Sequence, residues 1–404
     1  MNNYKEATAW LFKQLPSYQQ KGVVALNAKL DAITSFCDYL GFPEKKIKCI
    51  HVGGTNGKGS SSHMLASIFH EAGYKVGLYT SPHLKDFRER IKINGIDISE
   101  EAVLQFVIDH RDYMTTHTLS FFEMTVGMAF DYFSKSQVDI AIIEVGLGGR
   151  LDATNILTPE VSLITNIGFD HMDLLGNTLA QIAIEKAGII KDSVPVVISE
   201  WHRDTEAVFK AKASTVGASI YFASDEIEKE YATDLKGIYQ QRNIKGVVGV
   251  LRHLNGFNIT SSHIKKGLAR VVANTRLLGR WQTISLEPTI IADTAHNEAG
   301  IALTVKQLFQ TPHKRLHMVL GFVKDKDLSI ILPLLPVEAL YYISRPAIER
   351  GMDPAIVIEA AKKYNLFCNQ YTSVNEALKA AKKQANKEDL IYVGGSTFVV
   401  AEVL

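Results

Sequence analysis

Residues 47–60 read Ile-Lys-Cys-Ile-His-Val-Gly-Gly-Thr-Asn-Gly-Lys-Gly-Ser, a short apolar run that breaks into closely spaced glycines and a lysine. Residues 61–69 follow with apolar side chains at helical spacing. Glycines let successive backbone N–H groups turn toward one point, where the N-terminus of the helix and Lys58 add positive charge. The stretch predicts a strand, a phosphate-binding loop and a helix, with a nucleoside triphosphate as the bound molecule.

The loop departs from the general pattern G-x-x-x-x-G-K-[ST]. Val52 replaces the first glycine, and Gly59 stands at the Ser/Thr position. A tight glycine turn between strand and helix is therefore an alternative, although such a turn needs no lysine. If the loop binds ATP, the contacts come from the loop and the first helical turn: Gly54, Thr55, Asn56, Gly57, Lys58, Gly59 and Ser60.

The composition is that of a globular protein. The chain of 404 residues is 46% hydrophobic and 22% charged, and its length favours two domains. Forty-four Lys and Arg residues nearly balance 43 Asp and Glu residues, so the net charge is +1. This balance creates no overall field that would attract nucleic acid or an anionic membrane surface, and small molecules are the expected partners.

The cysteines and the N-terminus favour a cytoplasmic location. Cys37, Cys49 and Cys368 are far apart in the sequence and form no C-x-x-C pair, which favours a reducing compartment over a disulfide or zinc framework. The first residues lack the basic and apolar parts of a signal peptide, and no run of about eighteen apolar residues occurs. No membrane association is expected.

The middle of the chain has the pattern of a parallel sheet. Continuous Val and Ile runs at 138–145, 160–167 and 194–199 predict strands that are buried on both faces. The segment 177–190 between two of them has helical apolar spacing, and Asn177 can cap its first turn. Strands that alternate with helices in this way form a doubly wound α/β domain.

A second set of strands and helices occupies the last third of the chain. The segments with strand or helix patterns are 288–292, 298–309, 316–321, 339–344, 374–384 and 390–394. A helical stretch at 264–272 ends before a strand signal at 280–286, which places the domain boundary close to residue 278. We predict a P-loop domain with a doubly wound, mostly parallel sheet over residues 1–278, and a smaller α/β domain over residues 279–404.

A triphosphate site needs a divalent cation, and open α/β sheets form their sites at the carboxyl ends of the strands. Glu144, His171 and Ser81 each follow a predicted strand and offer oxygen or imidazole ligands for Mg²⁺ or Mn²⁺. Each has a structural alternative: a solvated carboxylate, a structural histidine or an ordinary turn serine.

Lys186 lies in the apolar helical segment 182–190, next to Glu185. On residue type alone, an exposed lysine is the preferred interpretation. If the lysine is instead buried, it needs a partner or loses its proton, and a neutral amine can react with CO₂ to give an anionic carbamate.

Taken together, these residues resemble the folylpolyglutamate synthase/dihydrofolate synthase family within the Mur ligase superfamily. The resemblance covers nearly the whole chain. The segments that carry it are His51-Val-Gly-Gly-Thr-Asn-Gly-Lys-Gly-Ser60, Thr80-Ser-Pro-His-Leu84, Phe121-Phe-Glu123, Glu144-Val-Gly-Leu-Gly-Gly-Arg-Leu-Asp-Ala-Thr-Asn155, Asp170-His171, Glu185-Lys-Ala-Gly188 and Asp293-Thr-Ala-His-Asn297.

The resemblance implies an ATP-dependent ligase that adds L-glutamate to dihydropteroate, to tetrahydrofolate or its polyglutamates, or to both. ATP would first phosphorylate the acceptor carboxylate, and glutamate would then displace phosphate from this acyl phosphate. The family's metal ligands match Ser81, Glu144 and His171 at two expected Mg²⁺ sites. The resemblance also reverses the interpretation of Lys186, because the equivalent lysine of the family is carbamylated and organises the second metal.

The resemblance assigns further residues to ATP and the acceptor. Asn243, Arg280 and Asp293 are expected to contact ATP, with residues 279–404 completing the cleft for ATP and glutamate. The pterin-binding region matches Thr80, Ser120, Phe121, Phe122, Glu123, Leu151, Asp152 and Ala153. His296 is a candidate general base for the glutamate amine, with a structural histidine as an equal alternative.

Two positions depart from the family pattern. Tyr239 replaces a histidine in G-x-H-Q-x-x-N, and Glu298 replaces a proline.

Three other functions are alternatives to the folate ligase. They are a peptidoglycan-precursor ligase, a nucleotide-dependent switch or transport ATPase, and a non-catalytic nucleotide-binding regulator. The first is disfavoured because the 46 residues before Ile47 are too few for a UDP-binding domain. The choice between the two folate activities stays open, and the resemblance implies a monomer.

Overall fold

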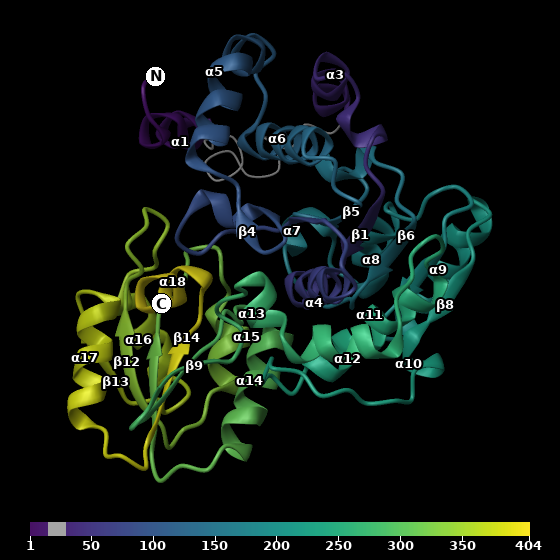
Figure 1. The fold of residues 1–404 in the computed structure, drawn as a ribbon. Helices are drawn as coiled ribbons and strands as arrows, with labels where there is room; N and C mark the ends of the chain where they lie inside the picture. Colours follow the sequence, from purple (N-terminus) through teal and green to yellow (C-terminus); the bar gives the residue numbers. More distant parts are fainter. Residues whose placement is uncertain (15–29) are drawn as a thin grey trace. The chain divides into compact units, whose positions relative to one another are not determined.

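The computed structural model describes residues 1–14 and 30–404, and the chain divides into two compact units (Figure 1). The first unit comprises Met1–Asp234 and Gln241–Arg276 within the described residues, and the second comprises Leu235–Gln240 and Leu277–Leu404. The short segment Leu235–Gln240 thus belongs to the second unit although both of its neighbours in the sequence belong to the first.

The first unit is built on a sheet with the strand order β4-β3-β2-β5-β1-β6-β7-β8. The neighbours from β2 to β8 are parallel, and β3 and β4 add an antiparallel edge. Its strands are β1 Cys49–Gly53, β2 Val76–Tyr79, β3 Ile91–Ile93, β4 Ile96–Asp97, β5 Ile140–Glu144, β6 Val161–Ile164, β7 Val196–Ile198 and β8 Ile220–Phe222.

Helices cover this sheet and extend from it. They are α1 Tyr4–Lys13, α3 Asp31–Tyr39, α4 Lys58–Glu71, α5 Glu100–Thr116, α6 Phe121–Lys135, α7 Met172–Leu175, α8 Leu179–Ala187, α9 Arg203–Thr215, α10 Ala223–Glu226, α11 Gln240–His253, α12 Ser261–Ala269 and α13 Val271–Thr275. Three short 3₁₀ helices are η2 Pro43–Lys45, η3 Phe87–Arg90 and η4 Ala153–Ile156. Figure 1 labels most of these helices along the purple-to-green part of the chain.

The second unit has its own sheet, with the order β13-β12-β11-β14-β10-β9. All neighbours are parallel except β9 and β10. The strands are β9 Gln282–Leu286, β10 Thr289–Ala292, β11 Leu316–Leu320, β12 Leu340–Ser344, β13 Cys368–Tyr371 and β14 Leu390–Gly394. The helices are α14 Glu298–Gln310, α15 Leu328–Ile331, η5 Leu332–Leu334, α16 Pro354–Lys362, α17 Val374–Gln384 and α18 Thr397–Val403.

The structure confirms the predicted fold class, a mostly parallel α/β sheet followed by a second, smaller α/β unit. Every residue of β1, β5 and β6 is buried, because helices on both faces exclude water from central parallel strands. Carboxyl ends of the neighbours β2, β5, β1 and β6 therefore lie along one edge of the sheet, and loops from that edge carry the predicted site.

Two local predictions were wrong. Thr178, not Asn177, caps the crossover helix α8, because its hydroxyl accepts the Gln181 N–H while the Gln181 side chain accepts the Thr178 N–H. The helix predicted at 264–272 is interrupted at Arg270, which separates α12 from α13. Within residues 1–14 and 30–404, no helix combines the length and apolarity needed to cross a membrane.

Candidate active site

The phosphate-binding loop joins β1 to α4, and its two positive-φ glycines have no room for a side chain. Gly54 has φ +135°, and a Cβ there would collide with the Thr165 hydroxyl. Gly57, the residue before α4, has φ +86°, and a Cβ there would collide with the Asn243 side chain. The loop backbone therefore approaches its neighbours more closely than any other residue type would allow.

Hydrogen bonds to the segment after β6 fix the loop. Asn166 accepts the N–H of Thr55 through its backbone oxygen (2.9 Å) and the N–H of Asn56 through its side chain (2.8 Å). The Thr165 hydroxyl donates to the Asn56 carbonyl at 2.6 Å. With its backbone groups held by Thr165 and Asn166, the loop is organised before any ligand binds.

Lys58 and Lys186 converge on one carbonyl. Lys58 Nζ donates to Gly54 O and to Thr55 O, both at 3.1 Å, and Lys186 Nζ donates to the same Gly54 O at 2.8 Å. These two lysines come from α4 and from α8, far apart in the sequence. An anion placed beside Gly54 would therefore meet two amino groups and the N-terminus of α4.

Lys186 is only 4% exposed, so the interpretation of an exposed lysine was wrong. The α8 helix packs its Lys186 side against the sheet, and Glu185 instead pairs with Arg150 at 3.0 Å. Burial, and secondly the positive charge of Lys58, lower the pKa of Lys186 to about 7. A substantial fraction of this amine is neutral at neutral pH.

Glu144 ends β5, and its side chain is 3% exposed. Glu144 Oε2 accepts the backbone N–H of Ser81 at 3.1 Å, so two of the predicted metal ligands lie together. This pairing follows from the sheet order, because β5 and β2 are parallel neighbours and Ser81 lies just beyond β2. A carboxylate and a hydroxyl are the kinds of oxygen ligand that Mg²⁺ prefers.

His171 lies beyond β6, at the residue that precedes α7, and it adopts a left-handed backbone conformation with φ +49°. Unlike Glu144, its side chain is 39% exposed, and Nε2 lies 4.0 Å from Asp170 Oδ2. In the described part of the chain, no three His, Cys, Asp or Glu side chains gather as a metal site. The predicted ligand set contains only one Glu and one His, so a cation there would also depend on hydroxyl, phosphate and water oxygens.

The start of α6 forms part of the predicted acceptor region. Ser120 and Glu123 form a capping box, in which Ser120 N donates to Glu123 Oε2 (2.8 Å) and Glu123 N donates to Ser120 Oγ (3.3 Å). The capping box fixes the first turn of α6, which contains Phe121 and Phe122. Phe121 is buried and stacks 5.6 Å from Phe12, whereas Phe122 is half-buried, with its ring 6.3 Å from Tyr79.

Asp152 is the centre of a buried polar chain that the sequence did not reveal. Asp152 Oδ1 accepts the Thr154 hydroxyl at 2.5 Å, and Thr154 Oγ1 lies 2.9 Å from His51 Nε2. Because Thr154 gives its proton to the carboxylate, His51 donates through Nε2. Burial, with a smaller contribution from Lys191, lowers the pKa of His51 to about 3, and burial raises the pKa of Asp152.

The other predicted acceptor residues flank these groups. Leu151 is half-buried, Ala153 is buried at the start of η4, and the buried Thr80 donates its backbone N–H to Arg90 O at 3.0 Å. A backbone N–H from Leu147 also reaches Asp152 Oδ2 at 2.8 Å. The residues predicted to bind the acceptor thus come from three segments: the residue after β2, the loop after β5 and the start of α6.

Asp293, in the second unit, is 1% exposed and accepts three hydrogen bonds. Oδ2 accepts from the Tyr239 hydroxyl and from Trp281 N, both at 2.7 Å, and Oδ1 accepts from Ala295 N at 2.8 Å. Arg280, adjacent to Trp281, donates to the Thr294 hydroxyl. Tyr239, the departure from the family pattern, therefore helps to fix a predicted ATP residue. Asn243 belongs to the first unit, whereas Arg280 and Asp293 belong to the second.

His296 lies two residues beyond Thr294 and is half-buried. Its Nδ1 lies 3.0 Å from the Thr294 carbonyl, which can only accept, so Nδ1 carries a proton. In the neutral ring Nε2 then carries the lone pair that a general base needs.

Comparisons with known proteins show similarity along the chain. Residues 52–280 match the Mur ligase middle domain, and residues 279–397 match the Mur ligase glutamate ligase domain. The chain is 31% identical to the dihydrofolate synthase/folylpolyglutamate synthase of Bacillus subtilis, over 99% of this chain and 98% of that protein. It is 30% identical to a probable bifunctional folylpolyglutamate synthase/dihydropteroate synthase of Haloferax volcanii, of which it spans 50%.

Solved structures of related enzymes have the same fold. Escherichia coli FolC in complex with DHPP and ADP has a TM-score of 0.86 and 28% identity, with 98% of this chain and 96% of that chain covered. Mycobacterium tuberculosis folylpolyglutamate synthase complexed with ADP has a TM-score of 0.87 and 27% identity, with 98% and 96% covered. The chain belongs to the folylpolyglutamate synthase/dihydrofolate synthase family of Mur ligases.

Proposed function

We propose that this chain uses ATP to join L-glutamate to the carboxylate of a pterin acceptor, with ADP and phosphate as the other products. Family membership over the full chain supports the reaction class, and the E. coli relative binds DHPP and ADP. A second relative has been solved with Mn, AMPPNP and L-glutamate bound. The observation that carries the proposal is the convergence of Lys58 and Lys186 on the Gly54 carbonyl of a preformed phosphate loop.

In the first step, a carboxylate oxygen of the acceptor attacks the γ-phosphorus of ATP, and the bond to the bridging oxygen of ADP breaks. Phosphoryl transfer of this kind requires mainly positioning and charge stabilisation. Lys58, at the N-terminus of α4, would move from the loop carbonyls to the transferring phosphate. We propose that Gly54 to Ser60 hold the phosphates, and that Asn243, Arg280 and Asp293 bind the rest of the nucleotide.

The residues present also fit a divalent cation. We propose that Ser81, Glu144 and His171 hold Mg²⁺ or Mn²⁺, because a buried carboxylate, a hydroxyl and an imidazole are acceptable ligands for both. When bound, such cations neutralise the charge that develops on the phosphates.

The environment of Lys186 favours carbamylation. A buried amine whose pKa is lowered to about 7 has a neutral fraction at neutral pH, and its nitrogen can attack CO₂. A nitrogen–carbon bond forms, one proton is released, and the side chain becomes an anion. We propose that carbamylated Lys186 then completes a second cation site beside Gly54.

In the second step, the glutamate amine attacks the acyl carbon, the carbon–oxygen bond to phosphate breaks, and an amide forms. The attacking amine must lose a proton. We propose that His296 accepts it through Nε2, because the Thr294 carbonyl holds the proton of Nδ1. We propose on the family resemblance that residues 279–404 contribute to the binding of ATP and glutamate.

Dihydropteroate and tetrahydrofolate or its polyglutamates are the proposed acceptors. Thr80, Ser120 to Glu123 and Leu151 to Ala153 form the proposed pterin region, in which Asp152 can accept from ring N–H groups. We also propose a cytoplasmic monomer that binds neither nucleic acid nor membranes. Three free cysteines support the cytoplasmic location, and the balanced charge supports the absence of nucleic-acid and membrane partners, whereas the monomer rests on the family resemblance.

The test is ADP release by the purified protein with Mg²⁺, ATP and L-glutamate, with products identified by mass. Dihydropteroate, tetrahydrofolate and a UDP-muramoyl peptide precursor are compared as acceptors. One added glutamyl unit on dihydropteroate establishes the synthase activity, and extension of tetrahydrofolate adds the polyglutamate activity. Turnover only with the UDP sugar, or ATP hydrolysis that is indifferent to every acceptor, contradicts the proposal. Light scattering on the same sample tests the monomer.

A further inference from the structure

The first helix of the chain, α1, packs against α5 and α6 and lies beside α5 in Figure 1. One of its faces contacts the loop of residues 81–90 through Tyr4 and Phe12. Tyr4 and Phe12 are eight residues apart, about two helical turns, and so project from the same side of α1. Ala7 and Leu11 beside them are fully buried in the core of the first unit. Burial of these side chains holds the helix in place.

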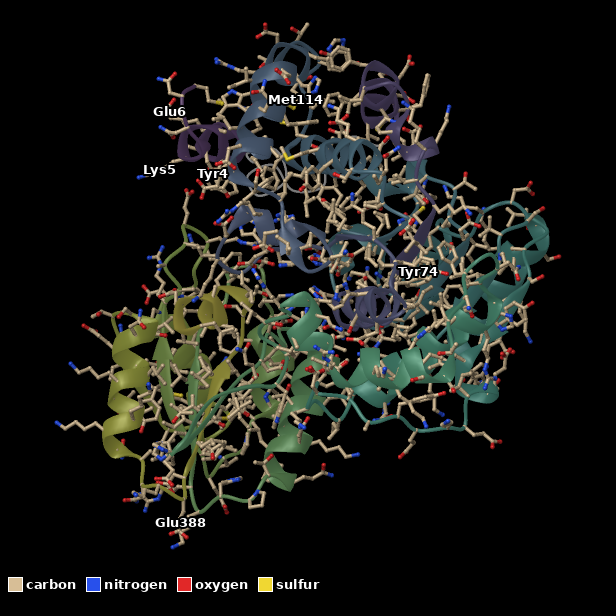
Figure 2. The ribbon with its side chains drawn as sticks, in the orientation of Figure 1. Tyr4, Lys5, Glu6, Tyr74, Met114 and Glu388 are labelled. Atoms are coloured by element: carbon tan, nitrogen blue, oxygen red, sulfur yellow. The ribbon has the colours of Figure 1, made fainter. Side chains whose placement is uncertain are left out.

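Tyr4, labelled in Figure 2, contacts the loop through its hydroxyl group, which donates to Asp86 Oδ1 at 2.7 Å. Asp86 also accepts from Arg88 through Nε and through the second guanidinium nitrogen, both at 3.0 Å. Burial alone would raise the pKa of Asp86, but the hydrogen bonds from Arg88 and Tyr4 lower it to about 2. The charged Asp86 thus links α1 to the start of η3.

Phe12 contacts the other part of the loop and the acceptor region. Its ring centroid lies 5.9 Å from that of His83, 6.4 Å from that of Phe87 and 5.6 Å from that of Phe121. His83 Nδ1 accepts from Arg90 Nε at 2.7 Å, which fixes the proton of the neutral ring on Nε2. Phe12 therefore packs on residues from both ends of the loop and on α6.

Ser81 begins this loop, two residues before His83, and its N–H is bonded to Glu144. His83 lies two residues and Asp86 five residues beyond Ser81, so a displacement of either would be transmitted through the backbone to Ser81, and through the Phe12 ring to Phe121. We propose that α1 is a positioning element for the acceptor and metal loop, with Tyr4 and Phe12 as its positioning residues. This inference rests on the proposed function, which assigns Ser81 to the metal and Phe121 to the acceptor.

The prediction distinguishes the acceptor from the nucleotide. Contacts of α1 reach the loop at 81–90, whereas the phosphate loop is held by Thr165 and Asn166. Loss of one α1 contact should therefore raise KM for the pterin acceptor by a larger factor than KM for ATP. One lost hydrogen bond corresponds to a change of about threefold to tenfold.

The experiment compares Tyr4→Phe, Phe12→Leu and the control Tyr113→Phe in the full chain. Tyr113 also donates one hydrogen bond, to Ser35 O at 3.0 Å, but it lies on α5 away from the loop. KM values for dihydropteroate and ATP are measured, together with hydrogen exchange of the loop amides of residues 84–86. We expect a higher acceptor KM and faster exchange in the first two variants only.

Equal increases in both KM values, or an effect of Tyr113→Phe as large as that of Tyr4→Phe, would overturn the inference, because either result indicates a general loss of stability. Normal acceptor KM in both α1 variants would overturn it as well. If the wild-type protein forms no glutamyl product with any pterin, that result would contradict the proposed function instead. The two failures are thus distinct.

Discussion

The phosphate loop and the loop of residues 81–90 both follow parallel strands of one sheet, but different parts of the chain hold them in place. The phosphate loop is held through its own backbone: its N–H and carbonyl groups form hydrogen bonds with Thr165 and Asn166 after β6, and Gly54 and Gly57 make room. Side chains fix the second loop. Glu89 alone accepts the N–H groups of Leu84 (2.7 Å), Lys85 (2.9 Å) and Asp86 (2.9 Å).

The difference follows from what each loop must do. Phosphates are bound by converging N–H groups, which a backbone without side chains presents most densely. An acceptor and a cation need particular side chains at fixed positions, so their loop needs a supporting set of charges and rings. In the phosphate loop, which presents backbone groups, activity should be most sensitive to substitutions within the loop itself. In the loop of residues 81–90, which side chains support, activity should also depend on supporting residues elsewhere in the chain. We call the first a backbone-built loop and the second a side-chain-built loop.

The largest effect is expected from Lys58→Met. The substitution removes the charge that the loop directs at phosphate but keeps the length and the apolar stem of the side chain. Loss of one such electrostatic contact lowers kcat by about a hundredfold to a thousandfold. Steady-state ADP release measures the loss, and Lys135→Met, which removes an exposed lysine paired with Asp131, serves as the control. Retention of more than a tenth of wild-type kcat would show that the backbone N–H groups are sufficient.

Lys186→Met should lower activity by about a hundredfold, because the proposed carbamate would be lost with the amine. In wild type, the pKa of Lys186 near 7 predicts that activation by CO₂ increases as pH rises through 7, where the amine becomes neutral. ¹³C-labelled bicarbonate should give a carbamate signal that is absent from Lys186→Met. Full activity after thorough CO₂ removal at pH 8 would contradict carbamylation.

The same lysine predicts a dependence of stability on pH. Because its pKa is lower in the folded protein than in the unfolded chain, the unfolded chain binds more protons between about pH 7 and pH 10.5. Stability of wild type should therefore increase with pH across this window in CO₂-free buffer. Lys186→Met should be the more stable protein by a few kcal/mol below pH 7. Denaturant unfolding at several pH values should show that this advantage disappears toward pH 10.

The two loops were not equally predictable from sequence. Gly54, Gly57 and Lys58 lie close together in the sequence and therefore form a recognisable motif. Because the backbone conformation requires glycine at Gly54 and Gly57, the residue types themselves indicate the loop. Glu144 and Ser81 were predictable as a pair because both follow strands, and parallel strands end at one edge. The burial of Lys186 was not predictable from residue type, since a lysine in an apolar helix is more often exposed. Only the family resemblance indicated a role in the site.

Contacts between distant segments that the strand order does not bring together were beyond prediction. Nothing in the sequence near Tyr4 or Phe12 indicates that they contact Asp86 or His83, because the partners are about seventy to eighty residues away and each pair is a unique tertiary contact. The same applies to Tyr239 and Asp293. The transfer of the segment 235–240 to the second unit was also missed, because hydrophobic periodicity reports local structure and not which core a short segment joins.

Glu89→Gln tests the side-chain-built loop directly. The amide keeps one acceptor oxygen but loses the charge and presents a donor to amide N–H groups, so at least one of the three hydrogen bonds should be lost. We expect KM for the acceptor to rise about tenfold, with stability lower by about 1 to 3 kcal/mol and KM for ATP unchanged. Thermal unfolding and kinetics with Glu228→Gln, an exposed residue, provide the comparison. A rise in KM for ATP instead would mean that the two loops are not independent.

The smallest effect is expected at Asp293, a site in the second unit that is also built by side chains. Tyr239→Phe removes one of its three donors, but Trp281 N and Ala295 N still hold the carboxylate, so KM for ATP should rise only about threefold. Tyr239→His should restore part of the loss if any donor at this position is sufficient. Tyr341→Phe, which loses its hydrogen bond to Pro336 O in the same unit, is the matched control. If Tyr239→Phe instead reduced activity as strongly as Lys58→Met, the hydroxyl itself would have to contact the nucleotide, and a side-chain-built site would be as sensitive as the phosphate loop.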